Sequence, residues 1–560
     1  MNQLFLRGRA FFASPRCVLG LAVGIGVLST LLLMIVSPVY YRDSVIYMSM
    51  VSGFRVGDWG HAFDVFMSPL LPAAAGILAR AGMPIPEATT FISCLFCILT
   101  VFPVYGLLSF YMERKYAAWG ALMFSLMPKI IRYGMSPLLD AGRWLFLSLA
   151  LYLIFRFVRH RKFLILCELG ATFAALSLVR SEGLVYMGML LAFLGLMLLQ
   201  AEKWKLSFRW IGRFVLYCLV IAGVCLALCL PRLIQLYRET GYPALDTRQT
   251  WAVRGVCHRI AVWTGTAEAA PAEPARADAA TYGSINDFDF AWISDWQFEK
   301  RFWKNMIDGC YVPYLILAVL GMFLLRRRKE WTFEHTIMLL LLAANAFAFF
   351  MMRSAAGRYF YINALFLMPF TVYGLRWVLA LLGKAPGKYR LEYLAAVALL
   401  AVGVLQLWNG LDNLNPSKND YFKILGRELA EWQKGVVPRS GTSNITLLTI
   451  GDEYGWGVYA GANSFAYAAN SISDTWTLQE IAEQGLPSEL TKYISENLDG
   501  YDRLLPDLIV VADPDEVSPS IISAICALKG VRQLRFPGDE KALFFQLRST
   551  PEVATGENVR

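Results

Sequence analysis

"SPLLDAGRWLFLSLALYLIFRFVRHRK" (residues 136–162) carries the pattern that decides the fold of this chain. An acid, Asp140, stands just before an apolar run at 142–158, and a group of basic residues follows it. An apolar run of this length can cross a bilayer as a helix. An excess of Lys and Arg marks the cytoplasmic end of such a helix. The stretch therefore predicts a transmembrane helix with Asp140 at its outer end.

The same pattern recurs along the chain and predicts an α-helical polytopic membrane protein. The 560 residues are 57% hydrophobic and 17% charged, with a mean hydropathy of +0.46, which is too apolar for a soluble protein of this size. About eleven transmembrane helices are expected. Their approximate positions are 17–38, 88–110, 116–133, 142–158, 163–180, 183–200, 212–230, 309–325, 334–352, 359–378 and 391–408.

The basic residues predict the orientation of these helices. They gather before the first expected span and after the second, fourth, sixth, eighth and tenth, which is one face of the membrane. The positive-inside rule makes that face cytoplasmic, so the net charge of +9 calls for no nucleic-acid partner. We expect a multi-pass protein of the cytoplasmic (inner) membrane, with a cytoplasmic N-terminus and outer loops at 40–87 and 231–308.

The chain becomes more polar after Trp408 and predicts a separate domain. Residues 444–450, 507–513, 531–536 and 542–548 have the composition of strands, and residues 418–435 and 518–530 that of helices. Strands alternating with helices indicate an α/β domain. We therefore expect a transmembrane module at 1–408 and a periplasmic, extracytoplasmic α/β domain at 409–560.

Two aspartates are expected at the same depth near the outer face. Asp43 follows the first span and Asp140 precedes the fourth, although 97 positions separate them (140 − 43). A single acid at such a place is usually a solvated cap, whereas two at matching depth favour a reactive site. Asp58 and His61 lie in the same outer loop as Asp43, where they either join the site or solvate the loop.

Arginines in the short outer turns give a second signal. Arg180 shares the turn LVRSEGLVY with Glu182, and Arg353 and Arg358 lie in MMRSAAGRYFYIN. Arg232 follows the seventh span. Positive charge there opposes the positive-inside rule, and a lipid phosphate, which guanidinium binds bidentately, would offset the cost. The alternatives are snorkelling to lipid head groups and, for Arg180, pairing with Glu182.

These features together resemble a known family. The resemblance rests on Asp43 with Tyr47 after the first span, SPLLP at 68–72, SPLLDAGRWLFLSLALYL at 136–153, and the turn around Arg180. ETGYPALDTRQ after the seventh span and GRYFYINALFLMPF at 357–370 extend it. The chain resembles C-type polytopic glycosyltransferases that use polyprenyl-phosphate sugars. Within them it is most similar to the bacterial protein mannosyltransferase-like group (family 39), to which the lipid A aminoarabinose transferases are related. It departs at Ser44, where the family often has Glu.

The resemblance implies an activity and roles for residues. It implies inverting transfer of a hexosyl or pentosyl group from a polyprenyl-phosphate donor to an acceptor hydroxyl of a protein, lipid or glycan at the outer membrane face. Asp43 is then the general base and Asp140 a second catalytic carboxylate. The donor phosphate is expected at Arg180, Arg353, Arg358 and Arg232. Substrate contacts are expected at Tyr47, Glu182, Asp58, His61 and Tyr359.

The sequence shows no clear metal site and leaves two alternative functions open. Cys94 and Cys97 lie inside a span without a second pair or a histidine partner, so we interpret them as packing. No cofactor is firmly predicted, and a divalent metal is possible but not required. The alternatives are a transporter of a lipid-linked saccharide, or a glycan polymerase or ligase. A proton-coupled transporter needs several mid-membrane acids, whereas Glu168 is the one that stands out.

Overall fold

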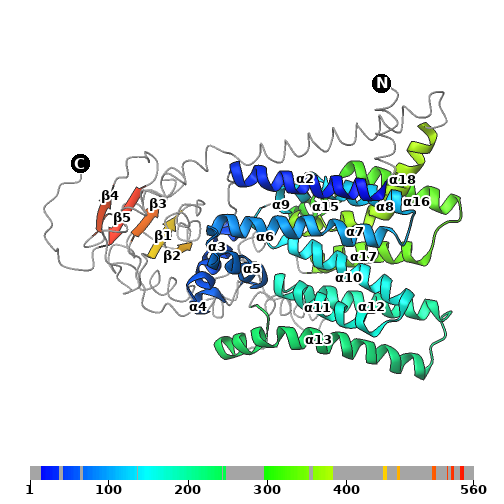
Figure 1. Cartoon of the computed structure of the whole chain (residues 1–560), viewed down its shortest axis with the longest axis horizontal. Coiled ribbons are helices and arrows are strands. Elements are labelled where there is room, and N and C mark those ends of the chain that lie inside the picture. Colours follow the sequence, from blue (N-terminus) through cyan, green and yellow to red (C-terminus); the bar gives the residue numbers. More distant parts are fainter. Residues whose placement is uncertain are drawn as a thin grey trace. The chain divides into compact units, whose positions relative to one another are not determined.

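The computed structural model of the chain is mostly helical (Figure 1). It describes residues 14–36, 42–57, 59–63, 67–134, 136–241, 244–246, 295–351 and 357–382, together with Cys526 and the strands of the C-terminal part. Two compact units are distinguished. Of the described residues, those up to Val36 and from Met50 to the end of the last helix form the first unit, and residues 42–49 and the strands belong to the second.

The helices follow the expected hydropathy pattern. The first part of the chain forms α2 (Pro15–Val36), α3 (Arg42–Val56), α4 (Trp59–Ala62), α5 (Leu70–Arg80), α6 (Ile85–Leu99), α7 (Val101–Leu108), α8 (Arg114–Ser125), α9 (Pro128–Gly134) and α10 (Asp140–His160). The next part forms α11 (Phe163–Val179), α12 (Gly183–Ala201), α13 (Phe208–Thr240), α15 (Asp295–Cys310), α16 (Val312–Arg327), α17 (Phe333–Met351), the 3-10 helix η2 (Gly357–Phe360) and α18 (Asn363–Leu382). Every expected span lies on these helices except 391–408, which is outside the described residues.

Several of these helices can cross a membrane by length and composition. Within the described residues there are five such stretches, namely Ile85–Leu108, Asp140–His160, Gly183–Ala201, Phe208–Arg238 and Phe333–Met351. The pair α15 and α16 adds a sixth if it is one span bent by 76°. The chain is therefore a multi-pass membrane protein.

Two expected spans are interrupted in ways that hydropathy does not show. The span at 116–133 consists of α8 and α9, because Pro128 cannot continue α8 but suits the first position of α9. The span at 309–325 begins at a bend, where Tyr311 takes the left-handed φ of 58° between α15 and α16. Both ends of the expected outer loop 231–308 are helical, because α13 continues to Thr240 and α15 begins at Asp295.

Small residues bring α16 and α18 into close contact. A Cβ on Gly321 would clash with the backbone carbonyl of Phe370, and one on Gly374 would clash with that of Leu317. Helices in lipid associate through such close packing, because lipid chains are as apolar as the side chains they replace. This close packing fixes the position of α18, whose first residue, Asn363, closely follows η2 in the sequence.

The described part of the C-terminal domain is a five-stranded mixed sheet. Its strands are β1 (Thr446–Ile450), β2 (Asn463–Ala466), β3 (Leu508–Val511), β4 (Val531–Leu534) and β5 (Leu543–Leu547), in the order β2-β1-β3-β5-β4. β1 pairs in parallel with β2 and β3, with Leu448 opposite Ile509, and β5 runs antiparallel to β3 and β4. The four expected strands are confirmed, and β2 was not expected. The helices expected at 418–435 and 518–530 lie outside the described residues, apart from Cys526.

Candidate functional site

The turn between α11 and α12 places Arg180 inside the helical bundle. α11 ends because Arg180 adopts an extended backbone (φ −152°, ψ 131°). Gly183 then starts α12 so close to α11 that a Cβ there would lie 2.6 Å from the Ser177 backbone. The turn is therefore only three residues long, and Arg180 is 6% exposed.

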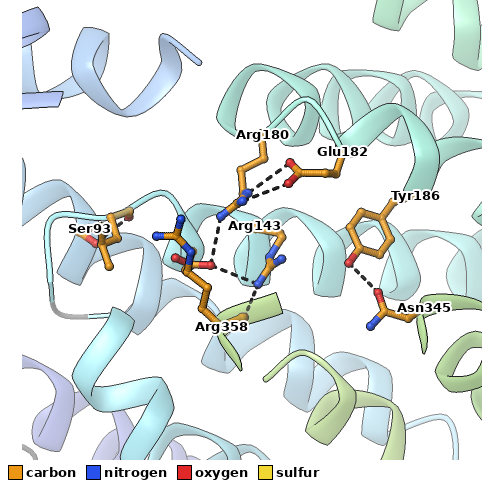
Figure 2. Close-up of polar contacts among 9 residues, drawn as sticks. Ser93, Arg143, Arg180, Glu182, Tyr186, Asn345 and Arg358 are labelled. Carbon is orange, nitrogen blue, oxygen red and sulfur yellow. Dashed lines mark hydrogen bonds and ion pairs between the residues drawn. The ribbon is translucent and has the colours of Figure 1, made fainter. Parts of the chain in front are cut away.

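Asp140, at the start of α10, accepts hydrogen bonds from two arginines. Its Oδ1 is 3.1 Å from Nη2 of Arg143, one turn further along α10, and 3.3 Å from Nη1 of Arg180 (Figure 2). Asp140 and Arg143 are fully buried. A carboxylate in the first turn of a helix is also stabilised by the helix dipole. Asp140 thus joins α10 to the turn that holds Arg180.

Glu182 binds the other edge of the same guanidinium. Nε and Nη2 of Arg180 donate to its two carboxylate oxygens at 3.2 and 3.0 Å. Burial acts to raise the pKa of Glu182, but the charge and hydrogen bonds of Arg180 outweigh it and lower the pKa to about 2. Burial acts to lower the pKa of Arg180, and the carboxylates of Glu182 and Asp140 raise it well above its ordinary value. Both groups are therefore charged at neutral pH.

Tyr359, in η2, provides the surface on which the guanidiniums gather. The Cζ atoms of Arg180, Arg143 and Arg358 lie 4.9, 5.6 and 5.7 Å from the centre of its ring. Phe349 of α17 stacks on the ring at 4.9 Å with an interplanar angle of 13°. Nη2 of Arg143 also donates to the backbone carbonyl of Arg358 at 2.7 Å. We call these three arginines with Asp140, Glu182 and Tyr359 the guanidinium cluster.

The cluster has more positive than negative charge and keeps unused hydrogen-bonding atoms. Among the described residues it combines three guanidiniums with two carboxylates. Nε and Nη1 of Arg143 and Oδ2 of Asp140 are buried and have no partner in the described part of the chain. A buried polar group without a hydrogen-bond partner lowers the free energy of unfolding by about 1–3 kcal/mol. The cluster therefore carries an unbalanced positive charge, with two donors on Arg143 that lack an acceptor and one oxygen on Asp140 that lacks a donor within the described residues.

Arg232 has different partners. It is buried on α13 and donates to the backbone carbonyls of Leu245, Phe63 and Met67 at 3.1, 3.3 and 3.2 Å. It also donates to the side chain of Gln235 at 3.1 Å. Three of these hydrogen bonds tie α13 to the segments that contain Phe63, Met67 and Leu245, and the fourth stays within α13. Arg232 thus braces these segments, and its expected contact with a donor phosphate stays a prediction.

The other expected site residues are placed only in part. Asp43 and His61 lie on α3 and α4, but their side chains are outside the described residues, as are Asp58 and Arg353 altogether. Tyr47 is buried on α3, four residues after Asp43. Because residues 42–49 and Asp140 belong to different units, the expected meeting of the two aspartates stays a prediction.

Residues that the sequence reasoning did not assign to the site also lie here. Arg143 is one of the arginines whose place at an expected outer turn opposes the positive-inside rule, but it was not assigned to the donor site. Its spacing of three positions after Asp140 on one helix supports that assignment. Tyr186, Asn345 and Asn363 form a buried hydrogen-bonded chain. Asn345 was detectable as an amide within an apolar span. In the described part of the chain no three metal-ligating side chains converge.

The sequence matches no protein-family model and no curated protein, but solved structures share its fold. ArnT from Cupriavidus metallidurans bound to undecaprenyl phosphate aligns with a TM-score of 0.58 and 12% identity, over 94% of this chain and 97% of that one. Apo ArnT from the same organism aligns with a TM-score of 0.56, at 12% identity over 94% and 98%. The Archaeoglobus fulgidus oligosaccharyltransferase in complex with Zn and sulfate has a TM-score of 0.54, at 13% identity over 91% and 70%. The chain therefore has the fold of the C-type polytopic glycosyltransferases, as the resemblance in its sequence predicted.

Proposed function

We propose that the chain is a membrane glycosyltransferase that moves a hexosyl or pentosyl group from a polyprenyl-phosphate carrier to an acceptor hydroxyl, with inversion. The guanidinium cluster is the observation that carries this proposal, because it combines surplus positive charge with unused donors on Arg143. The fold adds support, because ArnT, which shares it, binds undecaprenyl phosphate.

The cluster is suited to hold the phosphate of the donor. Negative charge grows on this phosphate as the bond to the sugar breaks, and fixed cations stabilise that charge. Asp140 and Glu182 hold the guanidiniums of Arg143 and Arg180 in place before the donor arrives. Arg358 adds charge beside the same ring, and we assign Arg353 and Arg232 to the donor site as well.

The acceptor needs a base, and we assign this role to Asp43. The acceptor oxygen forms a bond to the anomeric carbon while the bond from that carbon to the phosphate oxygen breaks. The electron pair of the broken bond stays on the phosphate, and the acceptor proton passes to the Asp43 carboxylate. Asp140 orients the arginines, and Tyr47, Glu182, Asp58, His61 and Tyr359 shape the substrate site.

The reaction is assigned to the outer face of the cytoplasmic membrane. α10 begins at Asp140 and has Arg159 and His160 in its last turn. The positive-inside rule therefore puts the cluster at the outer end of the bundle, with the C-terminal domain on the same side and the N-terminus in the cytoplasm. The acceptor is a protein, a lipid or a glycan, and a divalent metal is possible but not required.

The transporter alternative depended on Glu168 as an unpaired acid within a span. Glu168 does not stand alone in a span, because it accepts a hydrogen bond from Arg156 at 3.1 Å and both side chains are more than a third exposed. No observation favours a glycan polymerase or ligase over transfer from a polyprenyl phosphate.

The proposal is tested in cells that lack the gene. Wild-type chain restored to these cells is expected to add a hexose or pentose mass to a surface glycan, lipid or protein, and Arg180→Gln is expected not to. Arg213→Gln is the matched control, because Arg213 also pairs with a glutamate, Glu202, at 2.7 Å but is exposed. Identical mass profiles with and without the gene would overturn the proposal.

A further inference from the structure

Three buried polar side chains from three helices form a chain beside the guanidinium cluster. The Tyr186 hydroxyl of α12 donates to Oδ1 of Asn345 in α17 at 2.7 Å (Figure 2). Nδ2 of Asn345 donates to Oδ1 of Asn363, the first residue of α18, at 2.8 Å. All three side chains are buried. We call this set the amide chain. Polar side chains are costly to bury in an apolar bundle, so such a chain calls for a structural or functional reason.

Each member of the amide chain lies four residues from a residue that builds the guanidinium cluster or packs on it. Tyr186 follows Glu182 along α12, and Asn345 precedes Phe349 along α17. Residues four apart share a helix face, so these two members lie one helical turn from the cluster. Asn363 follows Tyr359 across the short turn that joins η2 to α18.

α17 therefore holds the segment of η2 and α18 at two points. Phe349 stacks on the Tyr359 ring, and Asn345 binds Asn363. If the amide chain is broken, Tyr359 loses one of its two supports on α17.

We propose that the amide chain is a positioning element for the anion site. It fixes α18 against α17 and α12, which fixes the Tyr359 ring, which in turn fixes the guanidiniums of Arg143 and Arg180. The inference rests on the proposed function for the identity of the anion, a polyprenyl phosphate. A chain that only joined helices would stabilise the fold without affecting this site.

The test compares two substitutions that each remove one buried hydroxyl. Tyr186→Phe removes the donor that holds Oδ1 of Asn345, and with it the constraint that points Nδ2 of Asn345 at Asn363. Tyr314→Phe breaks the bond from Tyr314 to the Met123 carbonyl at 2.7 Å, which joins α16 to α8. The purified full chain in lipid nanodiscs is titrated with undecaprenyl phosphate, and its Tm is measured. We expect similar losses of Tm, with about a ten-fold higher Kd for Tyr186→Phe only. Asn345→Leu, which breaks both bonds of the amide chain, is expected to raise the Kd further.

A double-variant cycle with Tyr359→Leu separates positioning from general stability. If the amide chain acts through the Tyr359 ring, Tyr186→Phe has no further effect on the Kd once Tyr359 is Leu. The positioning role is overturned if Tyr186→Phe raises the Kd by the same factor with and without Tyr359→Leu. It is also overturned if Tyr186→Phe and Tyr314→Phe have equal Kd values, and in both cases the proposed function stands. Failure of the wild-type chain to bind undecaprenyl phosphate overturns the proposed function itself.

Discussion

Arg180 and Arg143 share an aspartate, yet their guanidiniums are used in different ways. Arg180 donates from Nε, Nη1 and Nη2 to two carboxylates, whereas Arg143 keeps Nε and Nη1 without partners among the described residues. Arg180 is thus held by acids on two sides and contributes mainly charge. Arg143 has the donors that a phosphate oxygen needs, so the two residues differ in what a substitution should remove.

This difference predicts that Arg143→Lys behaves unlike a conservative change. Lysine keeps the charge but lacks the planar fork that binds Asp140 and the Arg358 carbonyl while leaving two nitrogens for an anion. We expect the Kd for undecaprenyl phosphate to rise by about ten- to a hundred-fold. Titration of the purified chain measures it, with Arg213→Lys as the exposed control. An Arg143→Lys variant that binds like wild type would show that charge alone suffices.

Glu182 predicts a pH-dependent stability. Its pKa in the folded chain is about 2, below the ordinary value of 4.5, so the stabilisation is complete above about 4.5 and is lost as pH falls toward 2. We expect Glu182→Gln to lower the Tm at pH 7, by the equivalent of at most about 3 kcal/mol. The gap to wild type should close between pH 4.5 and 2. Melting curves across this range measure it, and a gap independent of pH would contradict the ion pair.

The residues of the cluster differ in how far the sequence could reveal them. Asp140, Arg180 and Glu182 are charges in short turns between apolar spans, so they were predicted. Arg180 and Asp140 are 40 positions apart (180 − 140), and their contact depends on how α10 packs against α11. Asn363 is an uncharged amide at a helix start, which gives no signal until its neighbours are known.

At the scale of elements, hydropathy predicted the helices but not their interruptions. Hydropathy does not mark the bend at Tyr311, but Pro313 does, because a proline suits the first turn of a helix and not its interior. α15 was not predicted, although Phe298 and Phe302 stand one turn apart among charged residues and are both buried. The four-residue spacing of these phenylalanines indicates a helix, but it lies within residues 231–308, which were expected to form a loop.

The crossing of α16 and α18 predicts a strong effect of one methyl group. Gly321→Ala places a Cβ against the Phe370 carbonyl, so the helices must separate, and α18 carries Asn363. We expect a lower Tm and weaker binding of undecaprenyl phosphate. Gly223→Ala is the control, because its Cβ on α13 meets nothing within 4 Å and alanine favours a helix by up to about 1 kcal/mol. Equal melting temperatures for the two variants would show that the crossing tolerates the methyl group.

At the scale of the whole molecule, the proposed reaction divides its tasks between the arginines that bind the donor and the base that acts on the acceptor. The guanidinium cluster belongs to the first unit, whereas residues 42–49, with Asp43 and Tyr47, belong to the second. In the proposed mechanism, binding of the donor phosphate depends on the arginines, whereas transfer also needs the base. The two tasks are therefore separable by substitution, which gives the proposed mechanism its most direct test.

Asp43→Asn is predicted to keep donor binding and lose transfer. The amide has nearly the shape of the carboxylate but does not accept the proton of the acceptor hydroxyl, and removal of a general base typically costs about 10²–10⁴ in rate. Undecaprenyl phosphate should bind with unchanged Kd, because the cluster is intact, while the added sugar mass disappears from complemented cells. Asp308→Asn makes the same chemical change at an exposed position of α15 and should leave both measurements unchanged. If Asp43→Asn still restores the full sugar mass, the proton goes elsewhere and Asp43 is not the base. If the Kd rises as well, Asp43 takes part in donor binding, and the division of tasks between the arginines and the base is wrong.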